Sequence, residues 1–315
     1  MQIFRHYTPL PTTARGAVVA LGNFDGVHRG HQAVLGAARE QAQALGAPLG
    51  VVTFEPHPRS LFRPDDPPFR LTPFRVKAHC LADLGASLLF CLHFDRAFSM
   101  ISAEDFVRDI LVGGLAVRHV VIGWDYVFGR GRGGDAALLK NLADQFGFGI
   151  TTVDPFGDGN GTAEPVSATR IRQCLEAGDA KGAAHLLGRA WEIDGRVEHG
   201  DKRGRTLGFP TANVLLEDYQ RPRAGVYAVR VGLEEGAQVL WHDGVANIGT
   251  RPTVHGLDLR LEAHLFDFDG DLYGRHVRVA LIDWIRPEQK FAGLDALKAQ
   301  IAADADAARK LLRDA

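Results

Sequence analysis

The first half of the chain alternates short apolar runs with longer segments in which apolar residues recur at helical spacing. The apolar runs cover 17–21, 49–54, 88–92, 117–122 and 150–153, and uninterrupted runs of this length predict strands buried on both faces. The intervening segments 31–45, 73–84, 103–112 and 135–146 predict helices. Because strands and helices alternate, the pattern predicts a Rossmann-like parallel α/β sheet.

The second half has a different pattern. Turn residues at 154–162 are followed by a helical stretch over 170–187, and β-branched and aromatic runs separated by glycines then cover 191–198, 226–231, 239–248, 259–268 and 276–285. This pattern predicts a small antiparallel β-barrel. Apolar residues at helical spacing between 288 and 314 predict an amphipathic helix that caps the barrel. We therefore expect two domains, 1–187 and 188–315.

Composition narrows the class of protein. A length of 315 residues suits two domains, and a net charge of −2 argues against a general nucleic-acid binder. No segment approaches the roughly 18 apolar residues that a membrane span needs. The three cysteines, Cys80, Cys91 and Cys174, form no C-x-x-C pair, which is typical of reduced packing thiols. We expect a cytoplasmic protein without nucleic-acid or membrane partners; its oligomeric state stays open.

The most informative segment covers residues 18–32, where an apolar strand runs into a turn with three glycines and then into a helix. Gly22, Gly26 and Gly30 allow close approach of the backbone to a ligand. The helix N-terminus attracts phosphate, and His28 and His31 can donate hydrogen bonds to phosphoryl oxygens. A bare H-x-G-H match is more often a polar surface turn, but the flanking strand and helix favour a nucleotide site. No lysine follows a glycine, so a Walker loop is absent.

Two further segments of the first domain can bind ligands. The loop 123–129 follows a predicted strand, and its aromatic residues Trp124 and Phe128 suit either ordinary packing or contact with a flat ring. At 166–172, hydroxyl residues precede Arg170 and Arg172 at the start of a helix. Two arginines there oppose the helix dipole, which favours an anion at this position.

The second domain carries a glycine-rich and basic loop at 200–208, followed by Pro-Thr-Ala-Asn at 210–213. Thr211 and Asn213 offer oxygens to a magnesium-bound nucleotide, although an isolated P-T-A-N is more often a proline turn that enters a strand. In the later strand, alternation places Glu262 on the face opposite Leu261 and Ala263. A glutamate on such a face is usually only solvated.

The segments 22–31, 53–58, 123–129 and 167–170 resemble, in order, the adenylyltransferase motifs of the bacterial bifunctional riboflavin kinase/FAD synthetase family. The resemblance implies a domain with a nucleotidyltransferase-type sheet. It also implies that this domain transfers AMP from ATP to flavin mononucleotide (FMN). The FMN phosphate is already anionic near neutral pH, so this step needs no general base. By resemblance His28, His31 and Arg170 are catalytic, and Asp125 and Phe128 bind flavin. The implied ATP ligands are Gly22, Asn23, Phe24, Asp25, His28, His31, Ser167, Thr169 and Arg170.

The segments 200–214, 244–253 and 260–268 are similar to the riboflavin kinase signatures of the same family. By resemblance Gly208, Thr211 and Asn213 bind ATP, with Thr211 and Asn213 also holding Mg²⁺, while Arg251 binds flavin. The 5′-hydroxyl of riboflavin is a poor nucleophile and needs a base, and the resemblance assigns that role to Glu262. The expected cofactor is Mg²⁺ with ATP, and riboflavin, FMN and FAD are substrates and products.

Three other interpretations remain open at this stage. Ala168, Val127 and a short segment at 253–259 depart from the family pattern, which admits a single-activity FAD synthetase with a degenerate flavin-binding or sensing barrel. A flavin sensor would bind flavin without consuming ATP. A nucleotidyltransferase for another phosphorylated substrate would share the His-x-Gly-His turn but has no reason to carry the C-terminal motifs.

Overall fold

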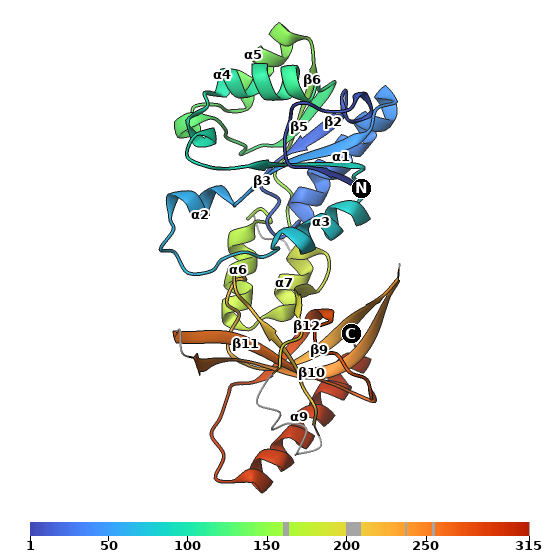
Figure 1. Cartoon of the computed structure of the whole chain (residues 1–315), viewed down its shortest axis with the longest axis vertical. Helices are drawn as coiled ribbons and strands as arrows, with labels where there is room; N and C mark the ends of the chain where they lie inside the picture. Colours follow the sequence, from blue (N-terminus) through green and yellow to red (C-terminus); the bar gives the residue numbers. More distant parts are fainter. Residues whose placement is uncertain (160–163, 200–208, 237, 254–255, 315) are drawn as a thin grey trace. The chain divides into compact units, whose positions relative to one another are not determined.

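The chain forms two compact units in a computed structural model that describes residues 1–159, 164–199, 209–236, 238–253 and 256–314, without the side chains of 251–258. Unit 1 contains 1–67 and 74–167, and unit 2 contains 68–73 and 168–315 (Figure 1). The domain boundary that the sequence predicts at 187/188 stays a prediction, and the structure assigns the helical segment after Ser167 to unit 2.

Unit 1 is built on a six-stranded sheet in which every strand pair is parallel, in the order β1-β4-β3-β2-β5-β6. This confirms the predicted parallel α/β sheet. The short edge strand β1 was not predicted, because three residues are too few for a periodic pattern. The strands are β1 Gln2–Phe4, β2 Val18–Leu21, β3 Leu49–Glu55, β4 Leu88–His93, β5 His119–Gly123 and β6 Gly149–Val153.

Helices cover both faces of this sheet, with α1 and α3 on one side and α4 and α5 on the other in Figure 1. They are α1 Arg29–Leu45, α2 Pro58–Phe62, α3 Phe74–Asp83, α4 Ala103–Asp105 and α5 Ala136–Phe146, with short 3₁₀ turns η1 Thr12–Ala14, η2 Phe98–Met100 and η4 Arg130–Arg132. All four residues of β2 are buried, and so are the first six of β3. Burial on both faces explains their uninterrupted apolar sequence.

The segment predicted as one α-helix over 103–112 is instead the single turn α4 followed by a π-helix, η3 Phe106–Gly114. The wider turn is closed by the N–H of Leu115, which donates to the carbonyl of Ile110 at 2.8 Å. It ends at Gly114, where a Cβ would lie 2.8 Å from the carbonyl oxygen of Tyr7. The apolar spacing of this segment indicated a helix but not its type.

In unit 2, the predicted helical stretch 170–187 is divided into α6 Ala168–Ala177 and α7 Ala180–Leu187. Gly178, with φ of +82°, ends the first helix in a left-handed conformation. The side chain of Asp179 then caps the second, because its Oδ1 accepts from the N–H of Gly182 at 2.7 Å. The glycine and the aspartate together stop one helix and start the next.

The sheet of unit 2 is antiparallel and forms a half-barrel with strand order β7-β12-β9-β10-β11-β8. This confirms the predicted small antiparallel barrel architecture. The strand β8 was not among the predicted runs, since its four residues follow a proline turn. The strands are β7 Trp191–Arg196, β8 Ala212–Leu215, β9 Gly225–Glu235, β10 Gln238–Thr253, β11 Gly256–Leu265 and β12 His276–Arg286.

The C-terminal helix α9, Leu294–Arg313, packs on β9, β10 and β12 of this sheet, as Figure 1 also shows. Ala308 and Leu312 are buried there beside Val226 and Val245. The predicted capping helix is therefore present, but it begins at Leu294 rather than at 288. Residues 287–293, between the end of β12 and the helix, have no regular structure, and Gly293 is the N-cap of α9.

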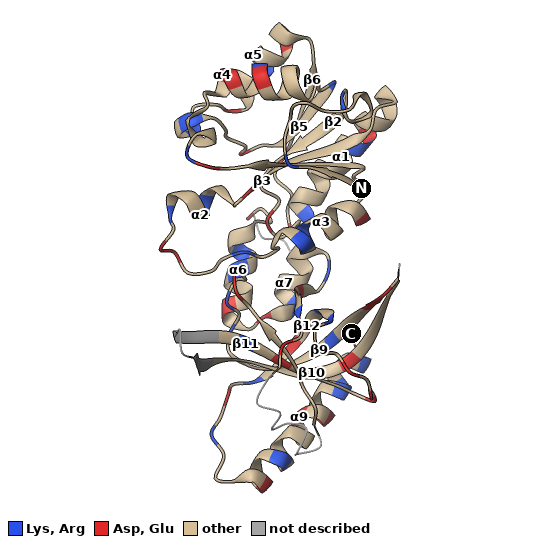
Figure 2. Ribbon diagram, viewed as in Figure 1, with Lys and Arg blue, Asp and Glu red and all other residues tan. Residues whose placement is uncertain are grey.

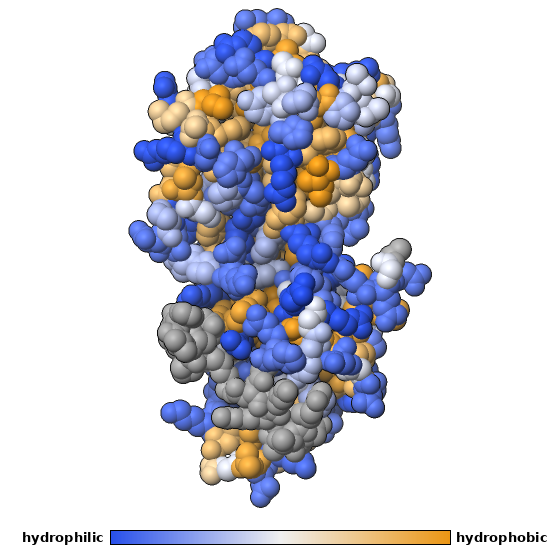
Figure 3. Space-filling model, in the orientation of Figure 1, coloured by the Kyte–Doolittle hydropathy of each residue, from blue (hydrophilic) through white to orange (hydrophobic). Residues whose placement is uncertain are grey.

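The surface is of mixed charge in both units. Figure 2 shows basic and acidic residues interspersed along the helices and strands, and Figure 3 shows hydrophilic residues over much of the visible face with apolar residues scattered among them. Among the described residues, no helix combines the length and apolar composition of a membrane span. Cys80 and Cys91 are buried, and all three cysteines are free thiols, as predicted.

Candidate nucleotide and flavin sites

The turn between β2 and α1 is organised by its two histidines. His28 is the N-cap of α1, and its Nδ1 accepts a hydrogen bond from the N–H of His31 at 3.3 Å. The two rings stack with centroids 3.6 Å apart. Because Nδ1 of His28 accepts, the neutral ring carries its proton on Nε2 and donates from that atom. The turn thus presents a helix N-terminus together with an oriented imidazole donor, as phosphate binding requires.

Glycine alone does not make the turn. Gly26 has a φ of +86°, but Phe24 and Val27 also adopt positive φ, at +49° and +45°. A branched side chain such as that of Val27 strongly disfavours this region, and such strain concentrates at ligand sites. Phe24 and Asp25 are nearly fully buried, and the Phe24 ring meets the His31 ring edge-on at 5.1 Å. Phe24 and Asp25 are both predicted ATP ligands, but the sequence did not indicate the positive φ of Phe24 and Val27.

A buried polar cluster lies behind the turn at the carboxyl end of β3. The Oγ1 of Thr53 donates to the carbonyl oxygen of Asn23 at 3.1 Å. The Nζ of Lys77, on α3, lies 3.0 Å from Oε1 of Glu55 and 3.4 Å from Oγ1 of Thr53. The side chain of Lys77 is fully buried. No sequence signal pointed to Lys77, because one lysine within an apolar helix pattern usually lies on the solvated face.

An aromatic cavity of about 630 Å³ lies at the same end of the sheet in unit 1. Burial raises the pKa of the Tyr126 phenol well above its usual range, as expected for a ring in apolar surroundings. Phe128, a predicted flavin ligand, lines the cavity, whereas Asp125 is exposed and is not among the lining residues. The lining includes Asn23, Phe54, Phe62, Phe94, Phe98, Phe106, Tyr126 and Phe128, with Arg59, Arg96, Arg130 and Arg132 around them.

The predicted helix-start residues divide between the units. Ser167 is the last residue of unit 1, and Thr169 and Arg170 lie in the first turn of α6, in unit 2. Arg172 has a structural contact that its position in the sequence did not suggest. Its Nε donates to the carbonyl oxygen of Phe69 at 2.9 Å, and its guanidinium lies 5.6 Å from the Phe69 ring centroid. It thereby fastens segment 68–73 within unit 2.

Two cavities among the described residues of unit 2 share Thr211. One, of about 290 Å³, is lined by Thr211 together with residues of the 268–273 loop. The other, of about 420 Å³, is lined by Thr211 and Glu262 together with apolar residues of β9, β10 and α9. Asn213 is 8% exposed, and its Nδ2 points to the carbonyl oxygen of Thr211 at 3.4 Å. Two predicted ATP and metal ligands are thus brought next to the predicted base.

The register of the sheet places Glu262 between two asparagines. It lies opposite Asn213 on β8 and opposite Asn247 on β10, and directly paired residues share a face. The Nδ2 of Asn247 donates to Oε1 of Glu288 at 3.0 Å. Leu261 and Ala263 are buried while Glu262 is partly exposed, which confirms the predicted alternation. Sequence reasoning missed Asn247 and Glu288. Gly208 and the Arg251 side chain lie outside the described residues.

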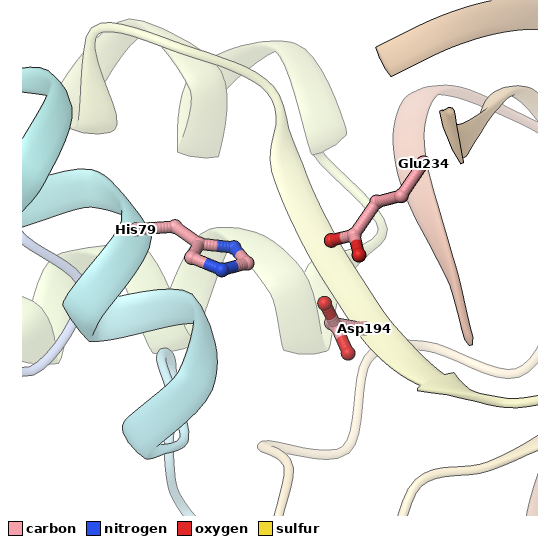
Figure 4. A group of neighbouring side chains, drawn as sticks. All are labelled: His79, Asp194 and Glu234. Atoms are coloured by element: carbon pink, nitrogen blue, oxygen red, sulfur yellow. The ribbon is translucent and has the colours of Figure 1, made fainter. Parts of the chain in front are cut away.

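A separate acidic pair lies in the half-barrel. Figure 4 shows the carboxylates of Asp194, on β7, and Glu234, on β9, pointing toward each other. The Nδ1 of His276, on the intervening strand β12, lies 3.4 Å from Oδ1 of Asp194. Figure 4 also labels His79, which belongs to α3 of unit 1. None of the three cavities is lined by these residues, and we assign them no part in the sites above.

Comparison with known proteins identifies the family. A family model described as FAD synthetase matches residues 10–170, and one described as riboflavin kinase matches 187–312. The bifunctional riboflavin kinase/FMN adenylyltransferase of Escherichia coli K12 is 48% identical over 94% of this chain and 92% of its own length. The protein of the same name from Pseudomonas fluorescens is 45% identical, with 99% and 98% covered.

The chain belongs to the bifunctional riboflavin kinase/FMN adenylyltransferase family. A crystal structure from Streptococcus pneumoniae, of a protein described as a macrolide-efflux protein, superposes with a TM-score of 0.84 at 32% identity and covers 98% of each chain. The match extends over both the parallel sheet and the half-barrel. The resemblance that the motifs indicated is therefore confirmed at the level of family and fold.

Proposed function

We propose that this family member converts riboflavin to FAD in two ATP-dependent steps, each carried out by a separate unit. Unit 2 phosphorylates riboflavin to FMN and releases ADP, and unit 1 transfers AMP from ATP to FMN and releases pyrophosphate. The observation that carries the proposal is that each unit has its own cavity next to its own predicted phosphate-binding residues. Asn23 of the nucleotide turn lines the cavity of unit 1, and Thr211 lines both cavities of unit 2.

In the kinase step, Glu262 is proposed to take the proton from the 5′-hydroxyl of riboflavin, whose oxygen then attacks the γ-phosphorus of ATP. The cavity beside Glu262 has apolar walls from Val226, Val245 and Leu297, which suit the flavin ring. The cavity on the other side of Thr211 then takes the nucleotide. Placing Thr211 between the two cavities puts the phosphates next to the hydroxyl that they modify, which lowers the entropic cost of reaction.

The residues of this region fit Mg²⁺. Thr211 and Asn213 supply hydroxyl and amide oxygens, and Mg²⁺ prefers hard oxygen ligands together with substrate phosphates. When bound, the ion neutralises charge on the phosphates of ATP. The amide of Asn213 is held by the carbonyl of Thr211 through its Nδ2, which leaves its Oδ1 as the atom oriented for a cation. We propose these two residues as the magnesium ligands of the kinase.

In the adenylylation step, an FMN phosphate oxygen attacks the α-phosphorus of ATP, and pyrophosphate leaves. Charge grows on the phosphoryl oxygens, so oriented donors and cations accelerate the reaction more than a base would. His28 and His31 at the N-terminus of α1 are proposed as these donors. The catalytic role that the sequence assigns to Arg170 stays a prediction, because Arg170 belongs to unit 2. The aromatic cavity is proposed to hold the isoalloxazine ring, with Phe128 as one of its contacts.

A chromatographic time course tests both steps. The protein is incubated with riboflavin, ATP and Mg²⁺, and the three flavins are separated at intervals. We expect FMN to rise first and FAD to follow. If riboflavin is unchanged but supplied FMN is converted to FAD, the kinase part of the proposal is wrong. If neither flavin is converted, the protein is no enzyme of this kind, and a flavin sensor becomes the better interpretation.

A further inference from the structure

The buried cluster of Lys77, Thr53 and Asn23 forms a directional chain of hydrogen bonds. A lysine ammonium can only donate, whereas a threonine hydroxyl donates once and accepts twice. With Lys77 donating to Oγ1, the Thr53 hydroxyl has its proton available for the carbonyl of Asn23, which lies 3.1 Å away. The charge of Lys77 is balanced by Glu55 at 3.0 Å. The lysine therefore fixes which way the threonine hydroxyl points.

Asn23 is the residue on which this chain ends, and it has two neighbours of functional interest. It lies in the turn that leads from β2 to His28, and it lines the aromatic cavity of unit 1. The adjacent Gly22 is still fastened to β3, since its N–H donates to the carbonyl of Val52 at 3.2 Å. The Thr53 hydroxyl thus holds the backbone, through its hydrogen bond to Asn23, at the point where strand, turn and cavity meet.

Stability alone is a poor explanation for a buried lysine here. Taking an ammonium and a carboxylate out of water costs about as much as their attraction returns, and an apolar pair of similar volume is often equally stable. Thr53 and the side chain of Lys77 are both fully inaccessible to solvent. The lysine can donate a hydrogen bond that orients the Thr53 hydroxyl, which a methionine or leucine at this position could not do.

We propose that Lys77 is a positioning residue for adenylyl transfer, acting through the Thr53 hydroxyl to hold the Asn23 peptide against the flavin cavity. The inference rests on the proposed function of unit 1. It predicts that loss of the chain weakens use of FMN, because the cavity wall formed by Asn23 is no longer fixed. Riboflavin phosphorylation by unit 2 should not change, and it serves as an internal measure of folded protein.

The decisive comparison is Thr53→Val with Thr53→Ser, measured as kcat and KM for FMN in FAD synthesis. Valine keeps the shape but lacks the hydroxyl, so the bond from Lys77 and the bond to the Asn23 carbonyl are both lost. We expect KM for FMN to rise about tenfold. Serine should restore KM to within about twofold of the parent, because its hydroxyl makes the same bonds. A merely structural defect lowers the amount of active enzyme, and therefore kcat, without moving KM.

Lys77→Met supplies the second arm. We expect it to raise KM for FMN as Thr53→Val does, and the double variant to show no further rise, because both changes break one chain. Glu55→Gln with Lys77→Met removes both charges and should recover thermal stability while KM stays high. An unchanged KM in Thr53→Val overturns the inference, as do additive effects in the double variant. A parent protein that makes no FAD from FMN overturns the proposed function itself, which distinguishes the two failures.

Discussion

At the residue scale, the two proposed chemistries depend on different side chains in different units. Glu262 lines a cavity of unit 2 next to Thr211, and His31 stacks on His28 in unit 1. Riboflavin must lose a hydroxyl proton, whereas the FMN phosphate is already anionic near neutral pH. Removing a base and removing a phosphate donor should therefore separate the two reactions.

Glu262→Gln should abolish FMN formation, with a loss of about 100-fold or more, because general-base catalysis typically contributes 10²–10⁴. FAD synthesis from supplied FMN should stay normal. Both rates are measured by chromatography of the flavins, with the exposed Glu217→Gln as the matched control. An equal loss of both steps in Glu262→Gln would contradict separate sites.

His31→Ala should have the reverse effect. FAD formation from FMN should fall by about 100-fold, the usual size of the loss when one oriented donor to a developing oxyanion is removed. Phosphorylation of riboflavin should continue. His6→Ala, at an exposed position of the same unit, is the control, and it should leave both rates unchanged. Normal FAD synthesis by His31→Ala would rule out a catalytic role for this histidine.

At the scale of elements, α9 forms part of the wall of the cavity beside Glu262, and a buried ion pair fastens it to β12. The guanidinium of Arg286, at the end of β12, makes two hydrogen bonds to the carboxylate of Asp304, at 2.6 and 2.8 Å. Gln300 donates to the same carboxylate at 2.9 Å. Asp304 is 5% exposed and also lines the cavity with Leu297 and Ile301.

Asp304→Asn should loosen this helix. Leaving Arg286 without its carboxylate partner is expected to lower the free energy of unfolding by about 3 kcal/mol, the lower end for breaking a buried pair. KM for riboflavin should rise, since α9 forms part of the cavity wall. Thermal unfolding and kinase kinetics measure the two effects. Asp306→Asn, exposed on the same helix, is the matched control, and an equal response in both variants would refute the argument.

At the scale of the whole molecule, the two activities are expected to be linked by a diffusible product. The variants Glu262→Gln and His31→Ala each retain one proposed activity. Mixed in equal amounts, they should convert riboflavin to FAD, because FMN made by one chain can bind the other. The time course should show FMN accumulating before FAD. If the mixture makes FMN but no FAD, then FMN has to pass within one chain, and the independence of the two units is wrong.

The sequence predicted the architecture well because the burial of a strand determines the local order of its apolar and polar residues. The uninterrupted apolar run of β3 indicates a strand covered on both faces, and the alternation around Glu262 indicates a sheet with one buried face. The types and the spacing of the glycines and histidines in the first turn predict a phosphate site. Family membership followed from the order of such motifs along the chain.

The tertiary structure alone decided the features that depend on neighbours distant in sequence. The π-helix over Phe106–Gly114 and the break at Gly178 follow from packing and backbone conformation. Arg172 donates to the carbonyl of Phe69 because the fold brings segment 68–73 beside α6. The ammonium of Lys77 can be buried because it donates to Glu55 and Thr53. The apolar periodicity of the helix does not indicate these contacts. Local conformational preference can be inferred from neighbouring residues in the sequence. The pairing of polar groups that are distant in sequence depends on the folded structure that brings them together.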